Sequence, residues 1–343
     1  MRKYLYTTLL LALLAQEGVM AQENEGKKGG FFGKIKDTFS TEIKIGNYTF
    51  KDGSVYTGEM KGRKPNGKGK TVFKNGDIYE GEYIKGKREG FGIYMFPDGE
   101  KYEGQWFQDQ QHGKGIYYFM NNNRYDGMWY QDYQHGEGTM YYHNGDLYVG
   151  HWVNDKREGE GTYTWANGAK YSGHWKNDKK NGKGTMNWDD GCKYEGSYLL
   201  GERTGAGVYY HANGDKYVGN FKDGMQDGRG TFTWANGAVY EGEWKNNKRE
   251  GKGTYKWSNG DVYEGDWKDN RPNGQGTLKT VAGMQYKGGF VDGLEEGQGV
   301  QTDKDGNRFE GFFKQGKKNG PFVETDKDGK VIKKGTYKFG RLQ

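Results

Sequence analysis

Cysteine, proline and aliphatic side chains are scarce in this chain of 343 residues. Cys192 is the only cysteine, which excludes an intramolecular disulfide framework. Four prolines, 62 glycines and a hydrophobic share of 32% do not describe an ordinary globular domain. The formal net charge of +6 comes without a basic block or binding motif, so we expect no nucleic acid as a partner. Aromatic residues, at 16%, are available to form the core instead.

Residues 1–21 differ in composition from the remainder of the chain. Two basic residues precede an apolar run over 5–14, and small residues stand where signal peptidase cleaves, before Gln22. We therefore expect a secretory signal peptide, cleaved near Ala21, and an exported protein that is periplasmic, bound to the cell envelope or secreted. A transmembrane anchor is the alternative, although the run is shorter than the ~20 residues of a membrane span.

Residues 22–45 are expected to form a polar spacer followed by a short amphipathic N-terminal cap. The first part, up to Gly30, is polar and glycine-rich. Apolar residues then fall at helical spacing and predict a helix that ends near Ser40. They are Phe31, Phe32, Ile35, Phe39 and Ile43. Covering the first strand edge is the favoured role of this segment, and contact with a membrane surface is the alternative.

An aromatic residue recurs every 23 residues from Tyr56 onward, without insertions, and defines twelve units. Its places are Tyr56, Tyr79, Tyr102, Tyr125, Tyr148, Tyr171, Tyr194, Tyr217, Tyr240, Tyr263, Tyr286 and Phe309. Glycine follows two residues later in every unit. A period of this length indicates a repeat array, in which each unit stacks on its neighbours. We assign the array, with a leading half unit, to residues 46–332 and a C-terminal cap to 333–343.

Each unit has the pattern of a β-hairpin. Residues 148–153 alternate in the period-two pattern of a strand, 154–158 form a polar loop, and Gly159 opens a second strand. Asn167-Gly168 then turns into the next unit. A three-residue turn with a glycine bulge is favoured over a two-residue turn, because it places the aromatic residues of adjacent hairpins on one face.

The predicted fold is therefore all-β: an elongated, single, antiparallel, twisted sheet of tandem 23-residue hairpins, advancing roughly 9.5 Å per unit. The expected structural aromatic residues include Tyr148, Trp152, Tyr163, Trp165, Tyr171, Trp175, Tyr240 and Trp244.

The unit also resembles a known repeat. Residues 240–244 (YEGEW), 251–255 (GKGTY) and 259–261 (NGD) resemble the membrane occupation and recognition nexus (MORN) repeat, and the resemblance covers residues 56–331. It implies an elongated sheet of antiparallel hairpins that serves as a scaffold or partner-binding module. Such arrays are sometimes attached to enzymes and are often proposed to touch membranes. We expect this chain to depart from that picture, with no attached catalytic domain and with a signal sequence before the array.

No pattern in the sequence supports catalysis, a cofactor or a metal site. Residues 62–69 nearly spell a phosphate-binding loop, but Gly69 replaces the Ser or Thr that would hold magnesium. Histidines such as His112 and His135 stand one unit apart, roughly 9.5 Å, which is too far to share a zinc ion. Acidic residues such as Glu241 and Glu243 occupy regular outward positions. We therefore expect no enzyme activity, no catalytic or metal-binding residues and no cofactor.

Basic residues recur in the predicted hairpin loops and form a candidate edge for an anionic partner. They are Lys64, Lys87, Arg88, Lys156, Arg157, Lys179, Lys180, Lys248, Arg249, Arg271, Lys317 and Lys318. Phosphate head groups of anionic lipids or an acidic protein would fit such an edge. Glutamates interleave with these bases, so an ordinary solvated edge is the competing interpretation.

The function predicted from the sequence is an exported, non-enzymatic scaffold that binds a protein. Peripheral binding of anionic lipid through the basic edge is the alternative. Binding of glycans to rows of tryptophan is a weaker one, and the rows are Trp106, Trp129, Trp152, Trp175 or Trp165, Trp188, Trp234, Trp257. An uncapped terminal strand could also pair end to end with a second copy of the chain.

Overall fold

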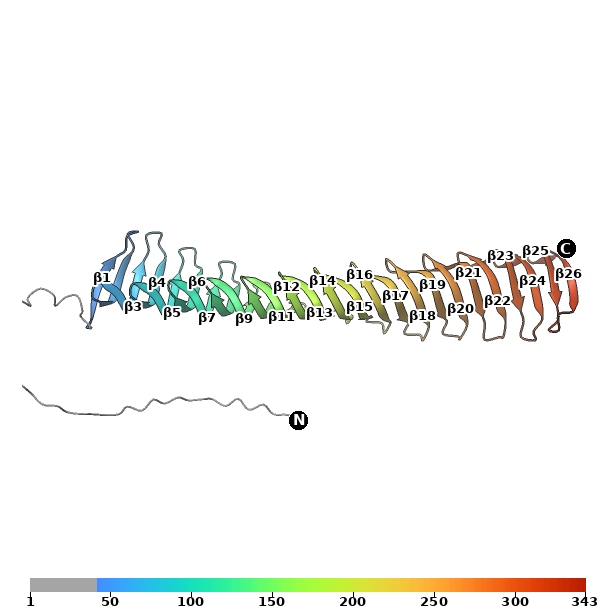
Figure 1. The fold of residues 1–343 in the computed structure, drawn as a ribbon, viewed down its shortest axis with the longest axis horizontal. Helices are drawn as coiled ribbons and strands as arrows, with labels where there is room; N and C mark the ends of the chain where they lie inside the picture. Colours follow the sequence, from blue (N-terminus) through green and yellow to red (C-terminus); the bar gives the residue numbers. More distant parts are fainter. Residues whose placement is uncertain (1–41) are drawn as a thin grey trace, which may run out of the picture.

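A single antiparallel sheet accounts for all of the chain that the structure describes. The computed structural model describes residues 42–343, which form a 27-stranded sheet and contain no helix. Each strand pairs with the strands before and after it in the sequence, for example β10 with β9 and with β11. Figure 1 shows a long, narrow, twisted ribbon with β1 and the C-terminus at opposite ends. The predicted all-β array of tandem hairpins is confirmed.

The strands follow the 23-residue period closely. The leading half unit is β1 (Ile43–Thr49). The first strands of the units are β2 (Val55–Lys61), β4 (Ile78–Ile84), β6 (Lys101–Phe107), β8 (Arg124–Tyr130), β10 (Leu147–Val153), β12 (Lys170–Lys176), β14 (Lys193–Leu199), β16 (Lys216–Lys222), β18 (Val239–Lys245), β20 (Val262–Lys268), β22 (Gln285–Val291) and β24 (Arg308–Lys314). The second strands are β3 (Lys64–Val72), β5 (Lys87–Met95), β7 (Gln110–Tyr118), β9 (Tyr133–Tyr141), β11 (Lys156–Thr164), β13 (Lys179–Asn187), β15 (Glu202–Tyr210), β17 (Met225–Thr233), β19 (Lys248–Lys256), β21 (Arg271–Lys279), β23 (Leu294–Thr302) and β25 (Lys317–Thr325). The sheet ends with β26 (Val331–Lys338) and β27 (Arg341–Leu342).

The sheet extends further at both ends than the array assigned from the sequence. Strand β1 begins at Ile43, before the predicted start of the array at residue 46. Strands β26 and β27 occupy most of the segment predicted as a C-terminal cap, 333–343. The predicted signal peptide, spacer and amphipathic helix lie outside the described residues, except for Ile43, which belongs to a strand.

The turn that joins one unit to the next is a three-residue turn with a glycine bulge, as predicted. Between β11 and β12, the Trp165 amide donates to the Ala169 carbonyl (2.9 Å) and the Gly168 amide donates to the Trp165 carbonyl (2.9 Å). Gly168 has a φ of 92°, in the region that favours glycine. Tyr163 therefore lies directly opposite Tyr171, and aromatic residues of adjacent hairpins share a face.

The turn inside each unit is shorter than predicted. Only Asn154 and Asp155 separate β10 from β11, with φ angles of 48° and 64°. Two successive residues with positive φ form the tight hairpin turn that Asn and Asp favour. The predicted loop over 154–158 and the predicted strand start at Gly159 are therefore wrong. Gly159 has a φ of 66° and lies inside β11, where the register with β10 shifts at a bulge.

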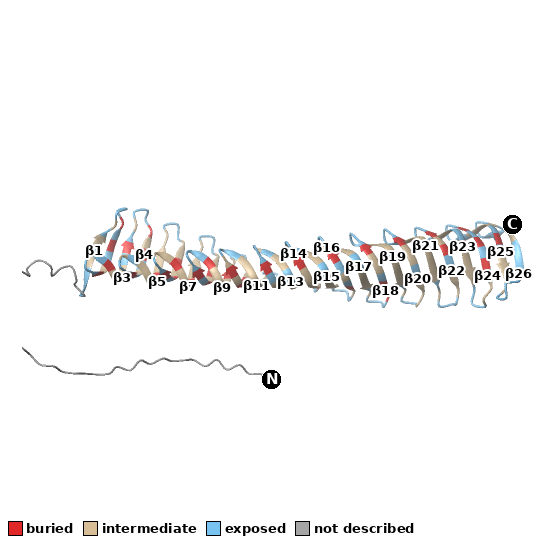
Figure 2. Ribbon diagram, in the orientation of Figure 1, coloured by how far each residue is buried: buried red, intermediate tan, exposed pale blue. Residues whose placement is uncertain are grey.

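The two faces of the sheet differ in composition, because side chains alternate along each strand. One side carries Tyr148, Trp152, Tyr163 and their equivalents in the other units, and we call it the aromatic face. The other side carries the residues between them, such as Val149 and His151, and we call it the open face. In Figure 2 the buried segments recur once per hairpin along the whole ribbon. The core is thus a line of rings on one face of a single layer.

Candidate binding surfaces

The aromatic face is closed by its own rings. Tyr148 has no exposed surface and makes edge-to-face contacts with Trp152 (centroids 5.2 Å apart) and with Trp175 of the next unit (5.4 Å). The Trp175 indole N–H donates to the Gly161 carbonyl at 3.1 Å, and the Tyr148 hydroxyl donates to the His151 carbonyl at 3.3 Å. Edge-to-face pairs of this kind are worth about 0.5–1.5 kcal/mol each beyond burial. This ladder of contacting aromatic rings therefore forms the core in place of aliphatic side chains, which are scarce in the chain.

The aromatic residues singled out from the sequence lie in this ladder. Six of them are buried, and they are Tyr148, Trp152, Tyr171, Trp175, Tyr240 and Trp244. Tyr163 and Trp165 are half-buried against the same cluster. The first of the two tryptophan rows considered for glycan binding is wrong as an exposed row, because Trp106, Trp129, Trp152 and Trp175 are buried. The second row, which includes Trp165, Trp188, Trp234 and Trp257, packs on the core.

Burial in the ladder holds the tyrosines in their neutral form. Burial raises the pKa of Tyr56 and of Tyr194 to about 12. For Tyr163, burial and a hydrogen bond from its hydroxyl to the Asp146 carboxylate (2.5 Å) both raise the pKa. These hydroxyls act as hydrogen-bond donors to backbone and carboxylate oxygens, which is a structural role.

The basic residues of the predicted edge divide into two groups, and neither group lies in a loop. Each exposed member is the first residue of a second strand: Lys64, Lys87, Lys156, Lys179, Lys248, Arg271 and Lys317. The following residue is half-buried on the aromatic face, at Arg88, Arg157, Lys180, Arg249 and Lys318. The placement of these bases in loops is therefore wrong, because the turn is two residues long and the strand starts earlier.

The second group stacks on the rings of the ladder. The Arg157 guanidinium lies 4.3 Å from the Trp175 ring centroid, its Nη2 donates to the Asp178 carbonyl at 2.9 Å, and its Nε lies 3.1 Å from Asp178 Oδ1. Arg88 repeats this arrangement with Trp106 and Asp109. Burial lowers the pKa of Lys180, which takes the same place one unit later. These cations already have partners inside the protein, so they are poor contacts for an external anion.

The first group places like charges opposite one another. Five of the twelve units end on the open face with a directly paired couple of cations: Lys61 with Lys64, Lys176 with Lys179, Lys245 with Lys248, Lys268 with Arg271, and Lys314 with Lys317. Directly opposed like charges destabilise a sheet. Acidic residues reduce the repulsion in some couples. Asp269 Oδ1 lies 2.7 Å from Lys248 Nζ, and Asp292 Oδ1 lies 3.7 Å from Arg271 Nη1. These couples were not predicted from the sequence, because the sequence does not show which residues lie opposite one another on neighbouring strands.

The open face carries exposed apolar side chains over β4–β10. We call this set the open-face patch, and its members are Ile84, Phe91, Phe107, Met128, Tyr130, Tyr133, Tyr141 and Val149. Each has between 40% and 55% of its surface exposed. The sequence did not predict this patch, since the residue types at most of its positions vary from unit to unit.

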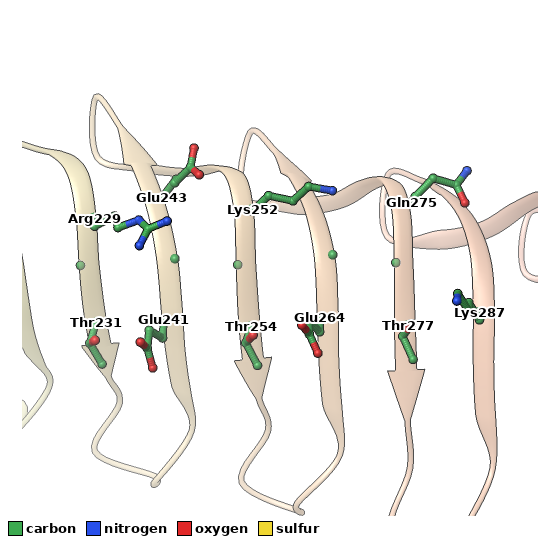
Figure 3. A pocket seen from close by; sticks show the side chains of 15 residues that line it. Arg229, Thr231, Glu241, Glu243, Lys252, Thr254, Glu264, Gln275, Thr277 and Lys287 are labelled. Atoms are coloured by element: carbon green, nitrogen blue, oxygen red, sulfur yellow. The ribbon is translucent and has the colours of Figure 1, made fainter.

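Further along the same face, over β17–β22, the surface is a shallow polar groove. Figure 3 shows its two walls: one has Arg229, Glu243, Lys252 and Gln275, and the other has Thr231, Glu241, Thr254, Glu264, Thr277 and Lys287. Glycines such as Gly242 and Gly253 lie between the walls. Charges of both signs alternate, and Lys252 Nζ pairs with Asp266 at 2.5 Å. Nothing in this groove selects a ligand of one charge, which agrees with the solvated role predicted for Glu241 and Glu243.

Residues 42–343 contain neither a candidate metal site nor a candidate membrane-spanning helix. His, Cys, Asp and Glu side chains in this range form no group of three or more that could hold a metal ion. Over the same residues, no helix is long and apolar enough to cross a membrane.

Comparison with known proteins identifies the family. The MORN repeat model matches twelve consecutive segments, from 56–78 to 309–331. The chain therefore belongs to the MORN repeat family and is built as a repeat scaffold or binding module. No curated protein matches it.

Several solved structures are distantly similar to this chain. The TCP domain of Drosophila melanogaster SAS-4, in complex with a proline-rich motif of Ana2, is 14% identical, with a TM-score of 0.30 over 46% of this chain and 85% of that one. The TCP10 domain of Danio rerio CPAP, in complex with a STIL peptide, is 12% identical, with a TM-score of 0.22 over 76% and 99%. Virginiamycin B lyase from Staphylococcus aureus is 10% identical, with a TM-score of 0.13 over 78% and 93%. At these TM-scores the likenesses establish neither a shared fold nor a shared ligand.

Proposed function

We propose that this protein is an exported, non-enzymatic scaffold that binds a partner protein through the open-face patch. The observation that supports this proposal is a group of exposed apolar side chains on a single-layer sheet whose other face is closed by its own rings. Contiguous exposed apolar patches mark interaction sites, and aromatic residues and methionine are enriched in protein interfaces. Phe107, Met128 and Tyr130 are residues of this kind.

Folding does not require apolar residues at these positions. The position of Phe91 in β5 is taken by Arg229 in β17 and by Lys252 in β19, and the position of Met128 is taken by Glu243. Those units form the same hairpins with charged side chains. Because the fold tolerates charge here, the apolar residues of β4–β10 are better explained by contact with a partner.

The residues found at equivalent positions in other units provide the substitutions for an experimental test. A variant with Phe91→Lys and Met128→Glu carries residues that the fold already accepts at those positions, and Arg229→Ala with Lys252→Ala is the matched control. Each chain is used to capture proteins from native cell-envelope extracts, with quantification by mass spectrometry. We expect a partner that is retained by the wild type and the control and lost with the patch variant. Retention of every captured protein by the patch variant would refute the proposal.

Binding of anionic lipid head groups is a second candidate, supported by the opposed cations at the hairpin ends. Couples such as Lys176 and Lys179 would gain stability from an external anion between them. We expect co-sedimentation with vesicles that contain anionic lipid, weaker at high salt and reduced by Lys176→Glu with Lys179→Glu. Arg157 is left unchanged in this variant, because it forms an ion pair with Asp178 inside the protein. Equal sedimentation with neutral vesicles would rule this candidate out.

A further inference from the structure

Five rings form a row across the open-face patch, and the recurring positions of the repeat did not predict it. Phe107 (β6), His112 (β7), Tyr130 (β8), His135 (β9) and His151 (β10) follow one another on successive strands. Their centroids are separated by 5.5, 5.3, 5.7 and 6.4 Å in that order. We call them the open-face ring row. It runs across the strands, along the long axis of the ribbon.

Two histidines in this row lack a turn hydrogen bond that most of their equivalents make. In seven of the ten other units the residue before the bulge glycine accepts a hydrogen bond from a backbone N–H in the next turn. Glu89 accepts from Gln108 at 3.0 Å, and Glu158 accepts from Asn177 at 2.9 Å. Glu250 and Glu296 repeat the bond at 3.1 and 2.8 Å.

His112 and His135 occupy the same place and make no such bond. The Nδ1 atom of each is covered and has no hydrogen-bond partner among the described residues. Repeats that give up a local stabilising contact without a structural gain mark functional positions. At these two positions the imidazoles therefore contribute to the ring row instead of to a turn hydrogen bond.

Charge also distinguishes the centre of this surface. The residues beside the ring row on β6–β9 include Gln105, Gln110, Met128 and Tyr133, and the two formal charges at neighbouring positions, Lys114 and Glu137, are of opposite sign. Five other units carry opposed cations at the corresponding hairpin ends, as at Lys176 and Lys179. Interface centres are depleted of charge. The surface is thus complementary to an uncharged segment of a partner rather than to an acidic or basic one.

We propose that the open-face ring row binds an uncharged, proline-rich segment in the polyproline II conformation. This inference rests on the proposed function and specifies the kind of partner. Phe107 and Tyr130 are equivalent residues one unit apart, and two strands advance about 9.6 Å. One turn of polyproline II, three residues at about 3.1 Å each, advances about 9.3 Å. A segment lying along the ribbon would therefore present one residue per turn to each of these rings.

Hydrogen bonding favours the same occupant. Polyproline II leaves its backbone carbonyls free, and proline has no N–H to donate. The row offers the matching donors, because the hydroxyls of Tyr130 and Tyr133, the Gln110 amide and the imidazole N–H groups can all donate. Aromatic-lined surfaces are a known way of binding such segments, since little conformational entropy is lost.

The test uses labelled decaproline and a Gly-Ser peptide of equal length, titrated against the full chain by fluorescence anisotropy. We expect saturable binding of decaproline but not of the Gly-Ser peptide, weakened about tenfold or more by Phe107→Ala with Tyr130→Ala. Val291→Ala with Leu294→Ala, at equally exposed hairpin-end positions, is the control and should leave binding unchanged.

A second variant separates binding from folding. His112→Glu with His135→Glu restores the residue that accepts the turn hydrogen bond in Glu89 and Glu158, so we expect unchanged or higher thermal stability together with lost decaproline binding. Absence of saturable binding by the wild type, or full binding by this variant, would overturn the inference. If decaproline fails while the partner captured from envelope extracts still depends on the open-face patch, the proposed function stands and only the polyproline inference falls.

Discussion

Replacing Lys156 and Arg157 separately by alanine removes the same formal charge from adjacent positions, and the structure predicts different effects on stability. Lys156 is exposed at the start of β11 opposite Val153, and its side chain makes no ion pair or ring contact with the described residues that alanine would remove. Arg157 has 19% of its side chain exposed, stacks on Trp175 and donates to the Asp178 carbonyl. The comparison therefore isolates the internal role of the second basic position from the effect of net charge.

The magnitude follows from the contacts that are lost. Hydrogen bonds that involve a charged group contribute about 1.5–3 kcal/mol and a partly buried cation–π contact about 0.5–2 kcal/mol. Because these terms share one guanidinium and part of it is solvated, we expect Arg157→Ala to destabilise the surrounding units by roughly 2–4 kcal/mol. Lys156→Ala should stay within about 0.5 kcal/mol of the wild type.

Hydrogen exchange measures this locally. Each unit contacts only its neighbours, so the loss is concentrated in β11–β13. There we expect Arg157→Ala to raise amide exchange rates by roughly 30- to 1000-fold, since about 1.4 kcal/mol corresponds to tenfold. Arg157→Lys should have a smaller effect, because Lys180 holds the same place in the next unit. Similar exchange in the Lys156 and Arg157 variants would refute the reasoning.

Three further predictions concern two glycines, a buried tyrosine and the N-terminus. A Cβ at Gly161 would lie 2.2 Å from the Tyr148 hydroxyl oxygen, whereas one at Gly168 meets nothing within 4 Å, so Gly161→Ala should lower the melting temperature through a steric clash. Gly168→Ala should cost only the strain of its φ of 92°, about 1–2 kcal/mol. Burial raises the pKa of Tyr194 to about 12, so its contribution to stability is full below about pH 10. That contribution is lost between about pH 10 and 12, and urea midpoints independent of pH over this range would contradict it. N-terminal sequencing of the mature protein should begin at Gln22, and an intact N-terminus would contradict export by signal cleavage.

The fold was predictable from the sequence, because the recurring tyrosine shows both the length of the repeat unit and which face of the sheet is buried. The tyrosines defined the unit, and Asn167-Gly168 defined the turn that puts Tyr163 opposite Tyr171. The inner turn was misplaced because Gly159 has the appearance of a strand start but lies in a bulge. The consecutive Asn154 and Asp155, both tolerant of positive φ, were the signal that would have located it.

The candidate surfaces were less predictable, because they depend on pairing across strands. Regular spacing suggested one basic edge, whereas alternation sends Lys156 to solvent and Arg157 onto the rings. The 21-residue separation of Arg157 from Asp178, repeated by Arg88 and Asp109, was a usable signal for the internal pairs. Within the open-face patch, Ile84, Phe107 and Tyr130 do recur at the 23-residue spacing, but the other members do not, and the set comes together only in the folded sheet.

The central claim, that a partner protein binds the open face over β4–β10, is tested most directly by site-specific photocrosslinking in the native cell. A photoreactive phenylalanine analogue is placed at Met128 in the open-face patch, at the equivalent Glu243 beside the polar groove, and at Phe96 on the aromatic face. We predict a crosslinked partner from position 128 and none from 243 or 96. Crosslinks of equal yield from all three positions, or from Phe96 alone, would contradict the account.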